Sequence, residues 1–167
     1  MNKLEYIPGD LVMTNGVPLG TVKDVVYRVT ASDPSATLEL DDGTVLKCFL
    51  CLENIEGAKF GEKGCLLDES CAWVKDIVPI PLTPEILEKN GWNKEEKDGS
   101  IFSLSEVFMG GDKDDEDNYT CFQLYYQNKE DGWDIDMRGE SLKYGIHYVH
   151  ELQHLLFGLG INHEMEV

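Results

Sequence analysis

The segment from residue 142 to residue 167 contains the one string in this chain that matches a catalytic motif. His150, Glu151 and His154 form the pattern His-Glu-x-x-His. On a helix, two histidines four residues apart lie on one face and can bind zinc, and the glutamate between them can activate a metal-bound water. The motif therefore predicts, as one of two interpretations, a zinc-dependent metallopeptidase with His150 and His154 as ligands and Glu151 as the base.

A catalytic zinc site also needs a third protein ligand, and the usual positions for one are occupied by other residues. Where one large class has a histidine six residues after the second motif histidine, this chain has Gly160, and His163 comes three residues later. The other common class takes a glutamate from a later helix, for which the stretch after His154 leaves no room. The second interpretation is that these polar residues form the water-facing side of an amphipathic helix.

The hydrophobic periodicity of the same segment predicts a helix over about residues 142–159. At about 100° per residue, His147, His150 and His154 gather on one side, with Glu151 at their edge. The apolar residues form the opposite stripe: Tyr148, Val149, Leu152, Leu155, Leu156 and Leu159. We therefore expect the leucines to pack on a sheet and the imidazoles to face water, which favours a protein without a bound metal.

The cysteines offer a second possible metal site. Cys48 and Cys51 have the Cys-x-x-Cys spacing of half a zinc knuckle, but they fall in a predicted strand, where residues three apart point to opposite faces. Cys65 and Cys71 are further apart than a usual half-site. We interpret these residues as ordinary thiols. Together with Cys121 they make an odd number, and the N-terminus has no export signal, which predicts reduced thiols in a cytoplasmic protein.

An acidic loop at residues 112–117 suggests a calcium site or a partner surface. A calcium loop of the EF-hand type starting at Asp112 would need glycine and glutamate where Asp117 and Gln123 stand, so a solvated acidic loop is the better interpretation. We expect a partner protein to contact this loop and the neighbouring strand face that carries Tyr119 and Tyr125. The acidic residues concerned are Asp112, Asp114, Asp115, Glu116 and Asp117.

The overall charge limits the classes of partner. The chain has 14 Lys and Arg against 32 Asp and Glu, a net charge of −18. Such a chain repels phosphate groups, so direct binding to nucleic acid or to anionic membranes is not expected, and no apolar run approaches a membrane span. The charge suits a protein that binds a basic partner. It also suits a third class, an inhibitor of a basic host enzyme that imitates nucleic acid.

The order of strand and turn signals predicts an α+β chain of two modules. Residues 1–78 are predicted to form a small β-barrel-like module of the SH3-like type. Its strands are expected near residues 9–12, 21–29, 37–40, 44–50 and 71–78. Residues 79–167 read as an α+β module. A helix at 83–90 begins with Thr83 and Pro84 and ends at Asn90-Gly91, and a β-meander follows at about 100–138 before the terminal helix.

The second module resembles a family of small uncharacterised proteins found in gut Bacteroidetes, their prophages and other mobile elements. The matching residues are Ile80, Pro81, Leu82, Thr83, Glu85, Leu87, Gly91 and Trp92, then Tyr148, Val149, His150, Leu152 and Gln153. The resemblance implies an α+β module whose last helix closes the sheet. It implies no activity, substrate or cofactor.

Together these observations favour a non-enzymatic, acidic, cytoplasmic protein that binds another protein in a phage or mobile-element setting. In this hypothesis the chain has no catalytic residues and no cofactor. The zinc peptidase and the nucleic-acid mimic are the alternatives.

Overall fold

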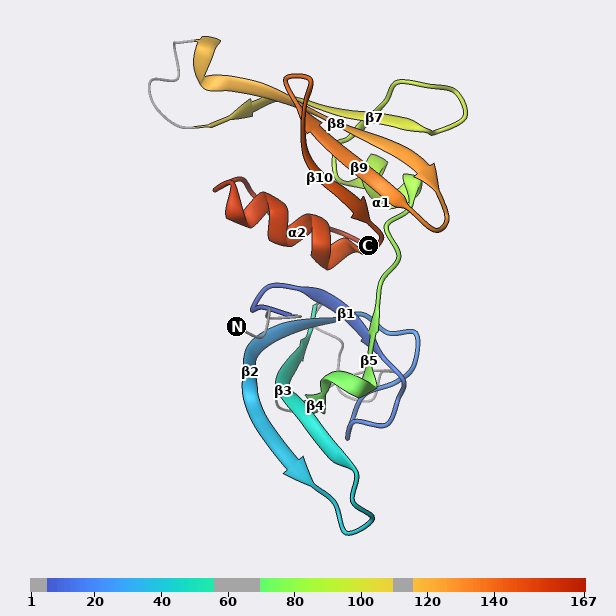
Figure 1. The fold of residues 1–167 in the computed structure, drawn as a ribbon, viewed down its shortest axis with the longest axis vertical. Helices are drawn as coiled ribbons and strands as arrows, with labels where there is room; N and C mark the ends of the chain where they lie inside the picture. Colours follow the sequence, from blue (N-terminus) through green and yellow to red (C-terminus); the bar gives the residue numbers. More distant parts are fainter. Residues whose placement is uncertain (1–5, 56–69, 110–115) are drawn as a thin grey trace. The chain divides into compact units, whose positions relative to one another are not determined.

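The computed structural model describes residues 6–55, 70–109 and 116–167, and the chain divides into two compact units, Met1–Ile80 and Pro81–Val167. Within the described residues, each unit contains one five-stranded antiparallel sheet (Figure 1). The fold is mostly β and belongs to the α+β class. Its short helices and 3₁₀ turns lie between strands, except for the last helix, which follows the last strand.

The sheet of the first unit has the strand order β4-β3-β2-β1-β5, so that the last strand of the unit pairs with its first. Its elements are β1 (Leu11–Thr14), β2 (Tyr27–Glu39), β3 (Val45–Asn54), β4 (Ser70–Trp73), the 3₁₀ turn η1 (Val74–Asp76) and β5 (Ile77–Pro79). Among the described residues the sheet is open, with β4 and β5 at its two edges.

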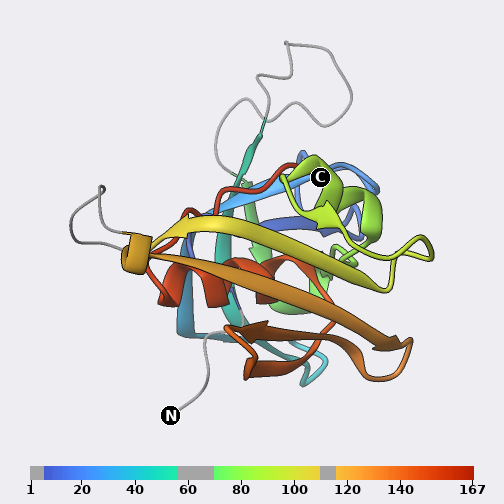
Figure 2. The ribbon, with the colours of Figure 1, turned by 90° about the horizontal axis from the view of Figure 1, so that it is seen from above.

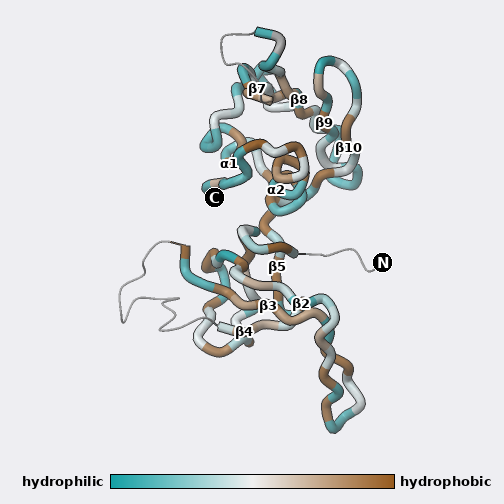
Figure 3. Tube along the Cα trace, turned by 90° about the vertical axis from the view of Figure 1, so that its left-hand side faces the viewer, coloured by the Kyte–Doolittle hydropathy of each residue, from teal (hydrophilic) through white to brown (hydrophobic). Residues whose placement is uncertain are grey.

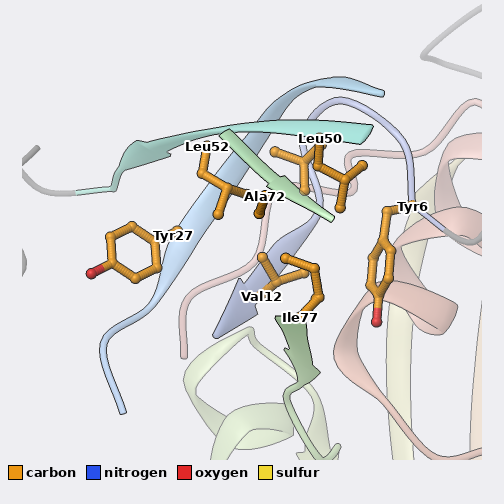
Figure 4. Close-up of a cluster of buried hydrophobic side chains, with 8 residues drawn as sticks. Tyr6, Val12, Tyr27, Leu50, Leu52, Ala72 and Ile77 are labelled. Atoms are coloured by element: carbon orange, nitrogen blue, oxygen red, sulfur yellow. The ribbon is translucent and has the colours of Figure 1, made fainter. Parts of the chain in front are cut away.

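The core of this unit lies on one face of the sheet, because alternate residues of each strand point to it. Leu50 and Leu52 of β3 are fully buried there. Figure 4 shows them beside Val12, Tyr27, Ala72, Ile77 and Tyr6. The hydroxyl of Tyr27 accepts a hydrogen bond from the main-chain N–H of Val22 at 2.8 Å, so the phenol's polar end is satisfied.

Two of the predicted strands in this unit are wrong in part. Residues 21–26 are not a strand, because Asp24 has φ +65°, which ends the extended conformation, and β2 begins only at Tyr27. The expected strand at 71–78 is two strands separated by η1. At that turn the buried carboxylate of Asp76 accepts a hydrogen bond from the side chain of Asn15 at 2.9 Å, which an uninterrupted strand would not provide.

Asp41, Asp42 and Gly43 form the turn between β2 and β3, and this turn gives a pH-dependent contribution to stability. The side chain of Asp42 accepts a hydrogen bond from the main-chain N–H of Thr44 at 2.8 Å, and this bond, together with a weaker effect of the Thr44 hydroxyl, lowers the pKa of Asp42 below its ordinary value. A carboxylate with a lowered pKa in the folded state stabilises the fold above its unfolded pKa, and this stabilisation is lost as the pH falls through the folded value. In urea unfolding followed by Trp73 fluorescence, Asp42→Asn should therefore lose less stability than the wild type between pH 6 and pH 3. An identical loss would contradict the assignment.

The second unit is a β-meander with two helices, and the predicted meander is confirmed. Its strand order, β10-β9-β8-β7-β6, follows the sequence. The elements are α1 (Pro84–Lys89), β6 (Asn93–Lys94), β7 (Ile101–Phe108), the 3₁₀ turn η2 (Glu116–Asn118), β8 (Tyr119–Asn128), β9 (Gly132–Met137), β10 (Glu140–Ile146) and α2 (Val149–Gly158). Figure 2 shows α2 running along one face of this sheet. In Figure 3 apolar residues recur along α2 and along the strands of the meander.

The predicted start of the terminal helix at residue 142 is wrong. Residues 140–146 form β10, which pairs with β9, and α2 begins only at Val149. The pairing of β10 is interrupted by two register shifts, and Gly145 has φ +68°, so the regular alternation that marks a strand in a sequence is absent here.

Candidate functional site

The histidine motif lies in the first turn of α2. Tyr148 is the N-cap residue, so His150 and Glu151 are the second and third helical residues, and His154 follows one turn later. The ring centroids of His150 and His154 are 5.6 Å apart, with the rings at 75° to one another. The structure therefore brings the two predicted zinc ligands side by side.

The carboxylate of Glu151 is bound to the start of its own helix. One oxygen, Oε2, accepts hydrogen bonds from the main-chain N–H groups of His147 at 2.7 Å and Tyr148 at 3.1 Å. Main-chain N–H groups at a helix start have no partner within the helix, and a glutamate at the third position commonly satisfies them. Glu151 thus has a structural role that is independent of any metal.

This role predicts that Glu151→Ala will destabilise the second unit by about 1 kcal/mol, within the range of about 0.5–2 kcal/mol seen for lost helix caps. Glu151→Gln should cost less, because the amide oxygen can still accept both hydrogen bonds. Urea unfolding followed by Trp92 and Trp133 fluorescence measures the difference. If both variants unfolded at the wild-type midpoint, the carboxylate would not be stabilising the helix.

The expectation that the imidazoles face water is wrong for His150, which is only 7% exposed. Its ring stacks on that of Tyr148, with centroids 5.8 Å apart and planes at 11°. Gln153, three residues later on the same side of α2, is 1% exposed, and its side-chain N–H donates to the carbonyl of His163 at 3.1 Å. The chain after α2 therefore folds back onto the side of the helix that was expected to face water.

The segment after α2, residues 162–167, is held by α1. The side chain of Asn90 donates to the carbonyl of Glu166 at 2.7 Å and accepts from the N–H of the same residue at 2.8 Å. The ammonium group of Lys89 donates to the carbonyl of Val167 at 3.0 Å. Sequence reasoning missed this contact, because Asn90 was interpreted only as the end of a helix, and no local pattern indicates a bond to a residue so far along the chain.

No group of three or more His, Cys, Asp or Glu side chains is arranged to hold a metal ion within residues 6–55, 70–109 and 116–167. The cysteines described there are thiols. Cys48 packs against the core of the first unit, whereas Cys51 lies opposite Cys71 on the neighbouring strand, so the prediction that Cys48 and Cys51 point to different faces is confirmed. Cys65 lies outside the described residues.

The predicted partner surface is described only in part. Asp112, Asp114 and Asp115, which belong to the acidic loop that was considered and rejected as a calcium site, lie outside the described residues. Glu116 is exposed, and Glu116, Asp117 and Asn118 form η2.

The two tyrosines of this surface, Tyr119 and Tyr125, are half-buried on one face of β8, whereas Phe122 and Leu124 on the other face are fully buried, as the alternation predicts. The ring of Tyr119 lies 5.4 Å from that of Phe108, and the hydroxyl of Tyr125 donates to the side chain of Gln123 at 2.6 Å. The tyrosine-bearing face is therefore partly open to solvent while the opposite face forms the core.

Comparisons with protein-family models, with curated proteins and with solved structures found no match. Among the described residues, neither helix is long and apolar enough to cross a membrane. The resemblance to the proteins of gut Bacteroidetes and their mobile elements stays a prediction.

Proposed function

We propose that this protein is a non-enzymatic, acidic, cytoplasmic protein that binds another protein, in a phage or mobile-element setting. The observation that carries the non-enzymatic part is the position of Glu151. A base that activates a metal-bound water must direct its carboxylate toward the metal, whereas the Glu151 carboxylate is directed back at the N–H groups of His147 and Tyr148.

The first unit supports a binding role through its topology. Five antiparallel strands are connected so that β5 returns to β1, with the short turn η1 just before β5. We propose that this unit is an open, SH3-like module, a type that often serves as an adaptor, although a fold alone does not fix a function.

The second unit offers a surface for a basic partner. Cross-strand pairing places Asp134 opposite Tyr125, and Asp136 opposite Gln123. Residues that pair across an antiparallel sheet share a face, so two carboxylates stand beside the half-buried tyrosine. An Arg or Lys side chain can pair with a carboxylate while it packs over an aromatic ring. We therefore propose that the face around Tyr119 and Tyr125, with the acidic loop that precedes η2, binds a basic protein.

Site-specific photo-crosslinking tests this surface. A benzophenone amino acid at position 125 should capture a host protein from lysate, and capture should fall as salt is raised, because salt screens exposed charges. The matched control places the same group at position 144, because Tyr144 is 70% exposed on β10, which β9 separates from β8 in the sheet. Equal capture at both positions, or capture that is indifferent to salt, would contradict a specific basic partner at this face.

One observation favours the zinc peptidase as a second candidate, namely the 5.6 Å separation of the His150 and His154 rings. In this alternative His147, His163, Glu164 or the acidic loop would supply the third ligand. Metal analysis of protein purified without chelator decides whether zinc is present in stoichiometric amount. Glu151→Gln then serves as a second test, because it keeps the helix cap and abolishes any hydrolysis that depends on a carboxylate base.

The net charge of −18 also supports a third proposal, an inhibitor that imitates nucleic acid and binds a basic host enzyme. Such a mimic would compete with DNA for a basic host nuclease at low salt, and failure to compete there would contradict it.

A further inference from the structure

Cys51 and Cys71 lie directly opposite one another on the paired strands β3 and β4. Cys71 is exposed and Cys51 is half-buried. Leu50 and Leu52, on either side of Cys51, are fully buried, and Ala72 beside Cys71 is also buried. Because successive residues of a strand alternate between faces, both thiols project from the face opposite the core.

The register that pairs these two residues is held on both faces of the sheet. Leu50 faces Ala72 in the core, and Phe49 faces Trp73 on the cysteine side, where their rings are in edge contact at 5.4 Å. A slip of one residue would turn every side chain of β4 to the wrong face. The two thiols are therefore fixed as cross-strand neighbours.

The spacing of such neighbours suits a disulfide. Residues directly opposite one another in antiparallel strands have Cα atoms about 4.5 Å or about 5.5 Å apart, depending on the hydrogen-bonding position. Both values fall in the range of about 4.4–6.8 Å that a disulfide spans. We propose that Cys51 and Cys71 are a redox modification site that forms a reversible cross-strand disulfide when the protein meets a small-molecule disulfide such as oxidised glutathione.

The exchange proceeds in two steps. The Cys71 thiol loses its proton to solvent, and the thiolate attacks one sulfur of oxidised glutathione, so that a mixed disulfide forms and one glutathione thiolate leaves. The Cys51 thiolate then attacks the Cys71 sulfur and displaces the second glutathione thiolate. The protein loses two hydrogens and is oxidised, while one oxidised glutathione becomes two reduced ones.

The disulfide would link the edge strand β4 covalently to its neighbour β3. Among the described residues β4 has only four residues, and its one neighbour in the sheet is β3. Short edge strands open more readily than central strands, because they have few hydrogen bonds and contacts. Joining Cys51 to Cys71 closes the connection between β3 and β4 into a covalent loop and opposes the detachment of β4.

Mass spectrometry of the full chain, incubated at low protein concentration with oxidised glutathione, tests the proposal. We expect a loss of two hydrogens, and a linked peptide that contains Cys51 and Cys71. Hydrogen exchange of the β4 amides should slow by at least about tenfold on oxidation. Cys51→Ser and Cys71→Ser should each abolish the linked peptide, and the matched control Cys121→Ser, in the second unit, should leave it unchanged.

Other products would overturn the proposal. These are a disulfide from Cys71 to Cys48 or Cys65, a glutathione adduct on Cys71 that never resolves, or no oxidation at all. None of these outcomes bears on the proposed binding of a basic protein, because that surface belongs to the second unit.

Discussion

Replacing Gly132 by alanine is expected to destabilise the second unit by about 2–4 kcal/mol, from the strain of a left-handed backbone and from a steric clash. Gly132 has φ +73°, and an added Cβ would lie 2.5 Å from the carbonyl oxygen of Ile146 and 2.9 Å from Nδ1 of His147. The carbonyl cannot easily retreat, because Ile146 pairs with Trp133 in the sheet. The clash would separate β9 from the end of β10, immediately before α2.

Gly139→Ala is the matched control, because Gly139 has φ +81° but no atom within 4 Å of the added Cβ. It should cost only about 1–2 kcal/mol, from backbone strain alone. Urea unfolding followed by Trp92 and Trp133 fluorescence compares the two variants. Equal losses would show that the contact with the Ile146 carbonyl does not limit residue 132.

Trp133→Ala is expected to cost about 3–5 kcal/mol, the range for removal of a large aromatic side chain from a core. Trp133 is 3% exposed, and its ring contacts those of Phe102 and Tyr126 at centroid distances of 5.7 and 5.0 Å. Its indole N–H also donates to the carbonyl of Leu82 at 3.3 Å. The side chain therefore connects three strands of the meander to the segment that precedes α1.

A comparison with Trp133→Phe separates packing from the hydrogen bond. Phenylalanine keeps much of the ring contact but leaves the Leu82 carbonyl without the indole donor, so we expect an intermediate loss. Tyr144→Ala, at a 70% exposed position of the same unit, should change stability by less than about 0.5 kcal/mol. Circular dichroism in urea follows all three variants. The expected order would fail if Trp133→Phe were as damaging as Trp133→Ala.

Local sequence signals predicted those parts of the fold that depend on interactions between residues close together in the sequence. Thr83 caps α1 by accepting from the N–H of Ile86 at 3.4 Å, and Pro84 is its first residue, as the start signals indicate. The alternation of β8 predicted its buried and half-buried faces. The strand β10 could not be predicted in this way. Its register shifts remove the alternation of buried and exposed residues, and only two residues separate it from α2.

The candidate site was predictable in its residues but not in its environment. The four-residue spacing of His150 and His154 was enough to bring them together on one helix. The burial of His150 was not predictable, because the periodicity of one helix does not show which other segments will pack against it. The capping role of Glu151 was also not predictable, because the N-cap residue is Tyr148 rather than the serine, threonine or aspartate that is typical of a capping box.

The contact between Asn90 and Glu166 has a practical consequence for handling the protein. Because the amide binds main-chain atoms, most substitutions at position 166 should preserve the contact, whereas proline there would remove the N–H that donates to Asn90. An affinity tag fused after Val167 would begin where the Lys89 ammonium group binds the chain. A flexible spacer before such a tag, or a tag at the opposite terminus, would leave this end of the molecule undisturbed.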